Sequence, residues 1–183
     1  MTINEDAESK LQPLKVAQAD EAQKSPRKSR TYEQKLACLR KAVSNSKEHL
    51  AAGDPPRVYS QYIRYALDEF RKLRTYTSIE AHGLRRGVVR EHVVPHSIVM
   101  DKLLNLDALT DEKLESVLQK YFSICVITKA EDLRLTAAGF RSKMPPGWDE
   151  EAGSIFARYD HEKVKISIQN RPPVVECHPE LTP

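Results

Sequence analysis

The sequence predicts an α+β protein that is mainly helical, with an N-terminal helical hairpin and a small two-stranded core. Apolar residues recur at helical spacing along residues 31–76, which predicts two amphipathic helices. Two short runs, 87–94 and 124–127, are rich in β-branched residues and predict strands. With 183 residues and 40% hydrophobic content, the chain can form one domain with a real core, which we place at residues 31–168.

The two ends of the chain are predicted to lie outside this domain. Residues 1–30 are rich in charged and small polar residues and contain no aromatic residue. Such a segment cannot bury enough apolar surface to offset the entropy lost on ordering, so we predict a flexible arm. The basic cluster at residues 24–30 either contacts phosphate or is a plain linker. Residues 169–183 are rich in proline, which predicts an extended tail.

The predicted hairpin joins a helix over residues 31–52 to a second helix over residues 58–76. The Gly-Asp-Pro-Pro sequence at 53–56 stops the first helix, because proline has no amide hydrogen and does not fit a helix interior. The second helix mixes tyrosines with arginines, namely Tyr59, Tyr62, Tyr65, Tyr76, Arg64, Arg71 and Arg74. The tyrosines either form a core stripe or, with the arginines, a surface that stacks on bases and binds phosphate.

Pro95 ends the first strand, because it cannot donate to the ladder of a sheet. Two helices are predicted next, at residues 96–104 and 110–122, as an insertion between the two strands. Thr110 is the predicted N-cap of the second helix, whose acidic first turn suits the helix dipole. The two strands are therefore expected to pair across an intervening pair of helices.

The second strand is predicted to lead directly into a helix. Thr128 and Glu131 have the Thr-x-x-Glu spacing of a capping box, which starts a helix at this point. Gly139 is the predicted C-terminal cap. A final short helix is expected to turn Arg158 and Tyr159 toward the body of the domain.

The motif Glu91-His92-Val93-Val94-Pro95 ends the first strand, and the run Cys-Val-Ile-Thr-Lys-Ala-Glu-Asp at 125–132 forms the second strand and the start of its helix. This arrangement over residues 85–145 resembles the ββα-metal, or His-Me finger, core of HNH-type nucleases. The resemblance implies that Glu91 and Asp132 bind a metal ion and that His92 is the catalytic base.

The resemblance has two departures from the family pattern. The helix position that is often histidine or asparagine is Asp132, and the usual middle asparagine has no counterpart, since Asn105 lies in a predicted helix. A structural interpretation also remains open. His92 is then a hydrogen-bonded histidine at a strand end, Glu91 pairs with an arginine such as Arg90 or Arg134, and Asp132 serves only the helix dipole.

The chemistry of these residue types suits phosphodiester hydrolysis. Imidazole, with an unperturbed pKa of about 6.5, can take a proton from water near neutral pH. Hydrolysis also needs a cation to neutralise charge on the scissile phosphate, and carboxylate oxygens favour Mg²⁺ or Mn²⁺. The predicted cofactor is therefore Mg²⁺ or Mn²⁺.

Positive charge is concentrated next to the motif, although the net charge of the chain is only +3. Residues 57–90 contain eight lysines and arginines against three acidic residues, and arginine suits bidentate phosphate contacts. A solvated helix face explains the same composition. The candidate nucleic-acid-binding residues are Arg71, Arg74, Arg85, Arg86, Arg90, His96 and Lys129.

These patterns predict a metal-dependent HNH-like endonuclease acting on DNA, in restriction or defence, as a possible homodimer. The alternative is a non-catalytic module that binds nucleic acid or a protein and carries a degenerate metal site. The three cysteines are far apart, which argues against a disulfide scaffold, and Cys125 is expected in the core. The sequence also has no membrane-spanning run, so we expect a cytoplasmic protein without a membrane partner.

Overall fold

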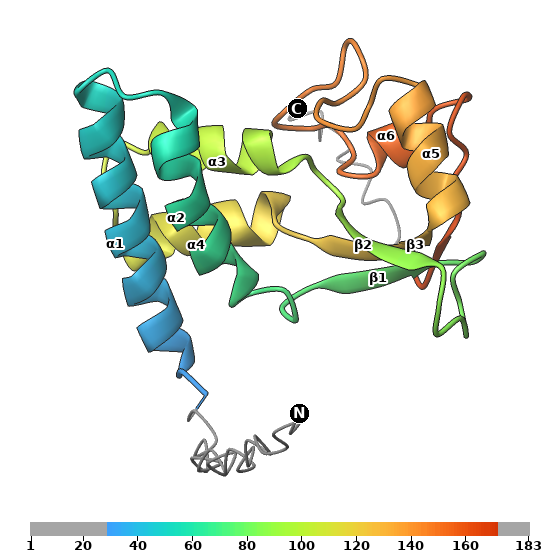
Figure 1. The fold of residues 1–183 in the computed structure, drawn as a ribbon, viewed down its shortest axis with the longest axis horizontal. Coiled ribbons are helices and arrows are strands. Elements are labelled where there is room, and N and C mark those ends of the chain that lie inside the picture. The colour runs from blue at the N-terminus through green and yellow to red at the C-terminus, as the bar shows by residue number, and fades with distance from the viewer. Residues whose placement is uncertain (1–28, 172–183) are drawn as a thin grey trace, which may run out of the picture.

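The structure, a computed structural model, describes residues 29–171 and has six helices and a four-stranded mixed sheet in that range (Figure 1). The α+β class is therefore confirmed. Nearly all of the predicted arm (1–30) and tail (169–183) lies outside the described residues. The elements are α1 (Tyr32–Ala51), α2 (Pro56–Asp68), β1 (Thr75–Ser78), β2 (Val88–His92), α3 (His96–Leu104), α4 (Asp111–Tyr121), β3 (Ile124–Thr128), α5 (Lys129–Ala137), α6 (Ala157–Asp160) and β4 (Ile168–Gln169).

The N-terminal helical hairpin is confirmed in α1 and α2. Thr31 caps α1 through a reciprocal pair of hydrogen bonds with Gln34, and Gly53 adopts a φ of 79° at the turn, where a side chain would be strained. The predicted end of the second helix at Tyr76 is wrong, because α2 stops at Asp68. The chain then turns and becomes extended, which places Tyr76 in a strand.

The sheet has four strands where the sequence predicted two. Its order is β2-β3-β1-β4, with β1 parallel to β3 and antiparallel to β4. The pairing of Thr75 with Ile124 joins segments far apart in the chain, so the helical periodicity of residues 58–76 gave no sign of it. The antiparallel pairing of β2 with β3 places Glu91 opposite Cys125 and His92 opposite Ile124.

The capping box that begins α5 is present and extends into the sheet. Glu131 is fully buried, and its Oε2 accepts hydrogen bonds from the Thr128 amide at 2.7 Å and from the Ser78 hydroxyl at 2.7 Å. Thr128 Oγ1 in turn accepts from the Glu131 amide. One carboxylate therefore ties the start of α5 to both β3 and β1, which fixes where the helix leaves the sheet.

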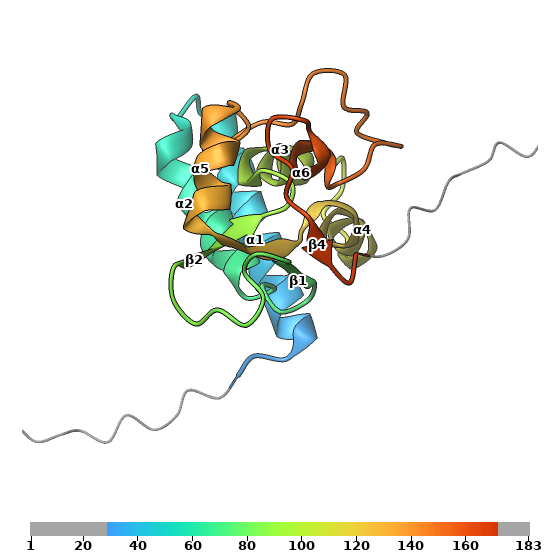
Figure 2. The ribbon, with the colours of Figure 1, turned by 90° about the vertical axis from the view of Figure 1, so that its right-hand side faces the viewer.

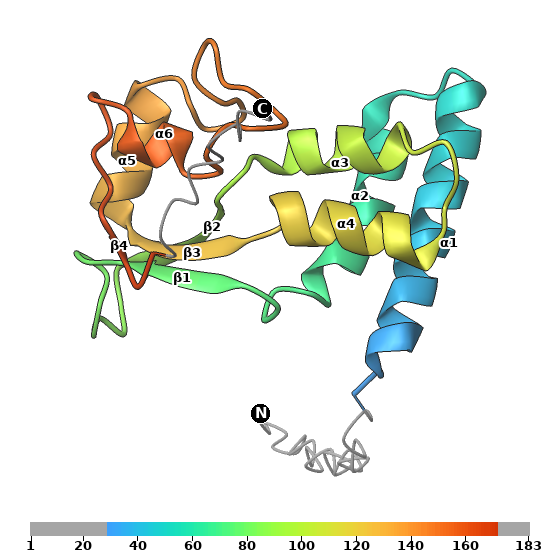
Figure 3. The ribbon, with the colours of Figure 1, turned by 180° about the vertical axis from the view of Figure 1, so that it is seen from behind.

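Two clusters of apolar side chains form the core. The first lies among α1, α2, α3 and α4, where α3 and α4 run side by side between the sheet and α1 (Figure 3). The second lies between one face of the sheet and the segment containing α5 and α6, which occupy the same side of the sheet (Figures 1 and 2). Side chains on the opposite face of the sheet, such as those of Thr75, Arg90 and Val126, remain wholly or partly exposed.

Several smaller predictions are confirmed. Gly139 follows α5 with a φ of 78° and donates to the Thr136 carbonyl, as a C-terminal cap does. Arg158 and Tyr159 are both fully buried, and burial of Cys125 in β3 raises the pKa of its thiol to about 12. None of the helices within residues 29–171 is both long and apolar enough to cross a lipid bilayer.

Candidate functional site

Glu91 lies on the covered face of β2, where its carboxylate is bound by an arginine. Its Oε1 accepts a hydrogen bond from Arg158 Nη2 at 2.7 Å, and its side chain is 22% exposed. Burial raises the pKa of Glu91 above its usual value, the Arg158 charge opposes that rise, and the nearby charge of Asp132 adds to it. Glu91 therefore pairs with an arginine, as in the structural interpretation, although this arginine is Arg158 and not Arg90 or Arg134.

Arg158 is a fully buried guanidinium that joins three separate segments. Its Nε donates to the Val93 carbonyl at 2.8 Å and its Nη1 to the Phe140 carbonyl at 2.8 Å. Nη2 also donates to the His92 carbonyl. In the part of the chain that the structure describes, Glu91 is the one carboxylate paired with this buried charge. Such a charge is tolerated only when it is paired and hydrogen-bonded, so Glu91 has a structural task.

Asp132 lies in the first turns of α5, on the helix that the Glu131 capping box holds against the sheet. Its side chain is half-buried and forms no hydrogen bond or ion pair within the described range. Its backbone carbonyl accepts a hydrogen bond from the Thr136 hydroxyl. Its charge is close enough to raise the pKa of Glu91. The two predicted metal ligands therefore influence each other electrostatically from β2 and α5, but no direct contact joins their side chains within the described range.

His92 points away from this pair of carboxylates. Successive side chains of a strand lie on opposite faces, so the imidazole of His92 and the carboxylate of Glu91 are on different sides of β2. The His92 ring lies edge-on to the rings of His96 and Phe122, with centroid separations of 5.5 Å and 5.7 Å. The structure therefore does not bring the predicted base to the predicted metal ligands.

The environment of His92 favours the neutral imidazole. Burial lowers its pKa to about 4, and the positive charges of His96, Arg158 and Arg64 act in the same direction, while Asp68 on α2 opposes them. Burial also lowers the pKa of His96, whose Nε2 is buried without a hydrogen-bond partner. Both rings are thus expected to be uncharged at neutral pH.

This environment predicts a pH-dependent stability. The unfolded chain binds a proton on His92 near pH 6.5, but the folded chain binds it only near 4, so the free energy of unfolding should fall as the pH drops through this window, by about 3 kcal/mol in total. Urea denaturation at a series of pH values measures this fall.

The matched variants for this measurement are His92→Gln and His82→Gln, since His82 is an exposed loop histidine. We expect the first to remove the part of the pH dependence due to His92 and to leave the part due to His96, and the second to leave the curve as in the parent protein. Equal curves for the parent and His92→Gln would assign the loss of stability at low pH to other groups.

The predicted nucleic-acid-binding residues fall into two groups. Arg85, Arg86, Arg90 and Lys129 are exposed around the junction of β2 with the start of α5, where the Lys129 amide donates to the Gly87 carbonyl. None of these four side chains forms an ion pair among residues 29–171. Unpaired cations at this position are available to a polyanion.

The remaining candidates lie elsewhere. Arg71 pairs with Asp68 of its own segment at 3.5 Å. Arg74 lines a hollow with Glu112 and Glu115 of α4, where the neighbouring carboxylates disfavour phosphate. His96 stands beside His92 on the other face of the sheet from Glu91. These three are therefore separated from the basic group near β2.

The donor set at Glu91 and Asp132 suits a hard cation. Mg²⁺ is commonly held by one or two carboxylates, while water and substrate phosphates complete its shell. Glu91 and Asp132 provide such oxygens, although Oε1 of Glu91 is shared with Arg158. No group of three or more histidine, cysteine, aspartate or glutamate side chains gathers as a ligand set within residues 29–171. Within that range the protein therefore offers two carboxylates for Mg²⁺ or Mn²⁺, and one of them is already paired with Arg158.

Arg158 is the residue of this site whose role the sequence did not reveal. The sequence predicted that Arg158 turns toward the body of the domain, but its partner, Glu91, lies 67 positions earlier, and no local pattern links the two. Comparison of the chain with protein-family models, with curated proteins and with solved structures finds no match in any of the three.

Proposed function

We propose that the protein is a metal-dependent endonuclease that hydrolyses phosphodiester bonds in DNA, with Glu91 and Asp132 as the metal ligands. The observation that carries the proposal is the antiparallel pairing of β2 with β3 and the helix α5 that follows directly. Glu91 is on β2 and Asp132 is on α5, and the charge of Asp132 raises the pKa of Glu91. When bound, Mg²⁺ or Mn²⁺ neutralises charge on the scissile phosphate.

Exposed arginines around β2 support a polyanionic substrate. Arg85 and Arg86 lie just before the start of β2, Arg90 lies on its outer face, and none of the three has a carboxylate partner among the described residues. Arginine binds phosphate oxygens in a bidentate manner, and such contacts position a duplex without reading its sequence. The proposed substrate is therefore bound chiefly through its backbone.

His92 is the proposed base and forms a separate part of the proposal. It adjoins Glu91 at the end of the edge strand β2, and its lowered pKa keeps the ring neutral and able to accept a proton. A pKa near 4 makes it a weaker base than an ordinary histidine, and its ring lies on the other face of β2. Its contribution has to be tested independently of the two carboxylates.

Cleavage of a supercoiled plasmid and of a labelled duplex oligonucleotide tests the proposed function. We expect cleavage with Mg²⁺ or Mn²⁺ and none in excess chelator, with the same helical circular dichroism in both, because the metal is bound by a preformed fold. An RNA duplex of the same sequence serves as the comparison for substrate class. A protein that fails to cut any of these substrates with either metal would not be the proposed enzyme.

A second candidate function is a non-catalytic nucleic-acid-binding module. Two observations favour it, the Glu91–Arg158 ion pair and the separation of His92 from the carboxylates. This candidate predicts binding that weakens steeply with salt, because neutralised phosphates release counterions, and no cleavage. Measuring binding and cleavage on the same duplex separates the two candidates.

A further inference from the structure

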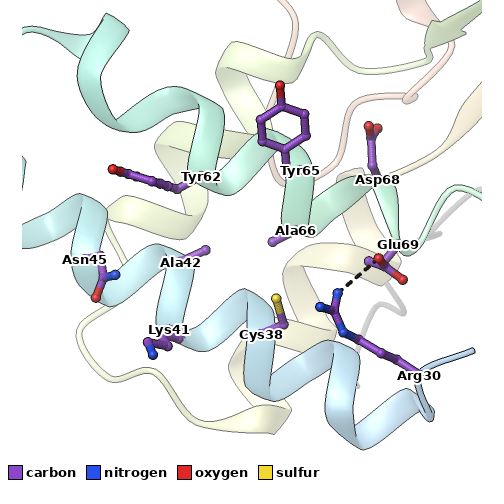
Figure 4. Close-up of a pocket in the computed structure, with 10 residues that line it drawn as sticks. All are labelled: Arg30, Cys38, Lys41, Ala42, Asn45, Tyr62, Tyr65, Ala66, Asp68 and Glu69. Atoms are coloured by element: carbon purple, nitrogen blue, oxygen red, sulfur yellow. Dashed lines mark hydrogen bonds and ion pairs between the residues drawn. The ribbon is translucent and has the colours of Figure 1, made fainter. Parts of the chain in front are cut away.

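The outer face of the helical hairpin contains a groove that the proposed nuclease function does not use. It has a volume of about 490 Å³ and lies between α1 and α2 (Figure 4). Small residues (Cys38, Ala42 and Ala66) lie between the helices, and Tyr62 and Tyr65 stand along the α2 side. The groove is thus apolar in its middle and open to solvent.

The α2 side of the groove is an exposed apolar stripe. Val58, Tyr62 and Tyr65 are spaced four and three residues apart, so they share one face of the helix, and they are 40%, 48% and 69% exposed. The sequence left open whether the tyrosines of this helix form the core or a surface. The structure divides them, because Tyr59 is buried whereas Tyr62 and Tyr65 are not.

The charges of α2 run against its own dipole. Negative charge is favoured at the start of a helix and positive charge at its end. Here Arg57 lies in the first turn, while Asp68 and Glu69 lie at the end, where they form exposed ion pairs with Arg71 at 3.5 Å and Arg30 at 3.1 Å. Arg57 forms no ion pair within residues 29–171. This order of charges becomes favourable when a second helix of the same sequence lies alongside in the opposite direction.

We propose that the groove receives α2 of a second copy of this chain, in a two-fold symmetric dimer. A two-fold contact requires one patch to carry both the projecting and the receiving part. The projecting tyrosines and the small residues between α1 and α2 meet that requirement. In the antiparallel arrangement, Arg57 of each copy lies near Glu69 of its partner, and the axis passes near Tyr62. The proposal does not rest on nuclease activity.

The mass of the full-length protein in solution tests the proposal. Light scattering and sedimentation over a concentration series should give twice the 20.9 kDa of one chain. Tyr65→Glu should raise the dimer dissociation constant at least about tenfold, because it places a charge in the apolar contact about one helical turn from the two-fold axis. The matched control is Leu133→Glu on α5, which is 67% exposed but lies outside the groove, and it should leave the dimer unchanged.

A charge exchange tests the antiparallel arrangement itself. Arg57→Glu and Glu69→Arg should each weaken the dimer, whereas an equal mixture of the two variants should restore it, because each glutamate then faces an arginine of the partner. Circular dichroism checks that all variants are folded. A monomer at every concentration, a dimer indifferent to Tyr65→Glu, or a mixture that associates no better than either variant alone would each overturn the proposal.

Discussion

Replacing Arg158 with methionine is expected to lower the free energy of unfolding by about 3 to 5 kcal/mol, the range seen when a buried charge pair loses one partner. The substitution keeps much of the aliphatic volume but removes all donors. It leaves the Val93, Phe140 and His92 carbonyls without this partner and Glu91 without its counter-charge. Urea denaturation monitored by circular dichroism measures the change.

The matched control is Arg30→Met, because Arg30 also pairs with a glutamate, Glu69, at 3.1 Å, but its side chain is 52% exposed. Exposed pairs of this kind typically contribute less than about 1 kcal/mol. A loss of the same small size in Arg158→Met would mean that the buried guanidinium does not hold the three segments together.

Asp132→Asn is expected to lower the rate of DNA cleavage by roughly a hundredfold or more, because one of two anionic metal ligands is lost, while the fold remains intact. The Asp132 side chain has no bonding partner in the described structure, so its removal exposes no unsatisfied group. Glu91→Gln should lose activity and stability together, since the carboxylate also neutralises Arg158. Comparing cleavage rates with denaturation midpoints separates the two roles.

His92→Ala belongs to the same set of variants. A general base contributes roughly 10²- to 10⁴-fold to a rate, so cleavage should fall by that factor while duplex binding is retained. His96→Ala, which removes the neighbouring ring, should cost less. If His92→Ala cut DNA as fast as the parent protein while Asp132→Asn did not, the result would support the proposed metal site. It would also show that a group other than His92 is the base.

The sequence was sufficient to predict the elements that depend on local signals. Thr128 with Glu131, Gly139 and the proline turn before α2 act within a few residues, and the structure has each of them. The strand β1 was missed because Thr75–Ser78 follows a helical repeat without a break, although the alternation of threonine and tyrosine suits a strand. Its partner, β3, lies about fifty residues later and could not be read from any local pattern.

The candidate site shows the same limit at the level of side chains. The motif correctly placed Glu91 and His92 at the end of a strand, and the capping box correctly placed Asp132 in the first turn of the helix that follows β3. Strand alternation alone puts Glu91 and His92 on opposite faces, but the motif did not show which of the two faces α5 and α6 would cover. That outcome depends on Arg158 and on the rings of His96 and Phe122, which come from other segments.

The position of β2 at the edge of the sheet has a consequence for association between chains. An edge strand presents unpaired backbone groups to other molecules, and the β-branched residues of β2 favour strand pairing through them. Arg90 places a charge on the outer face of this strand, Glu91 places one on the inner face, and Pro95 limits its length. Charged and proline residues at such positions are common safeguards against edge-to-edge pairing, so these side chains also protect the folded chain from aggregation.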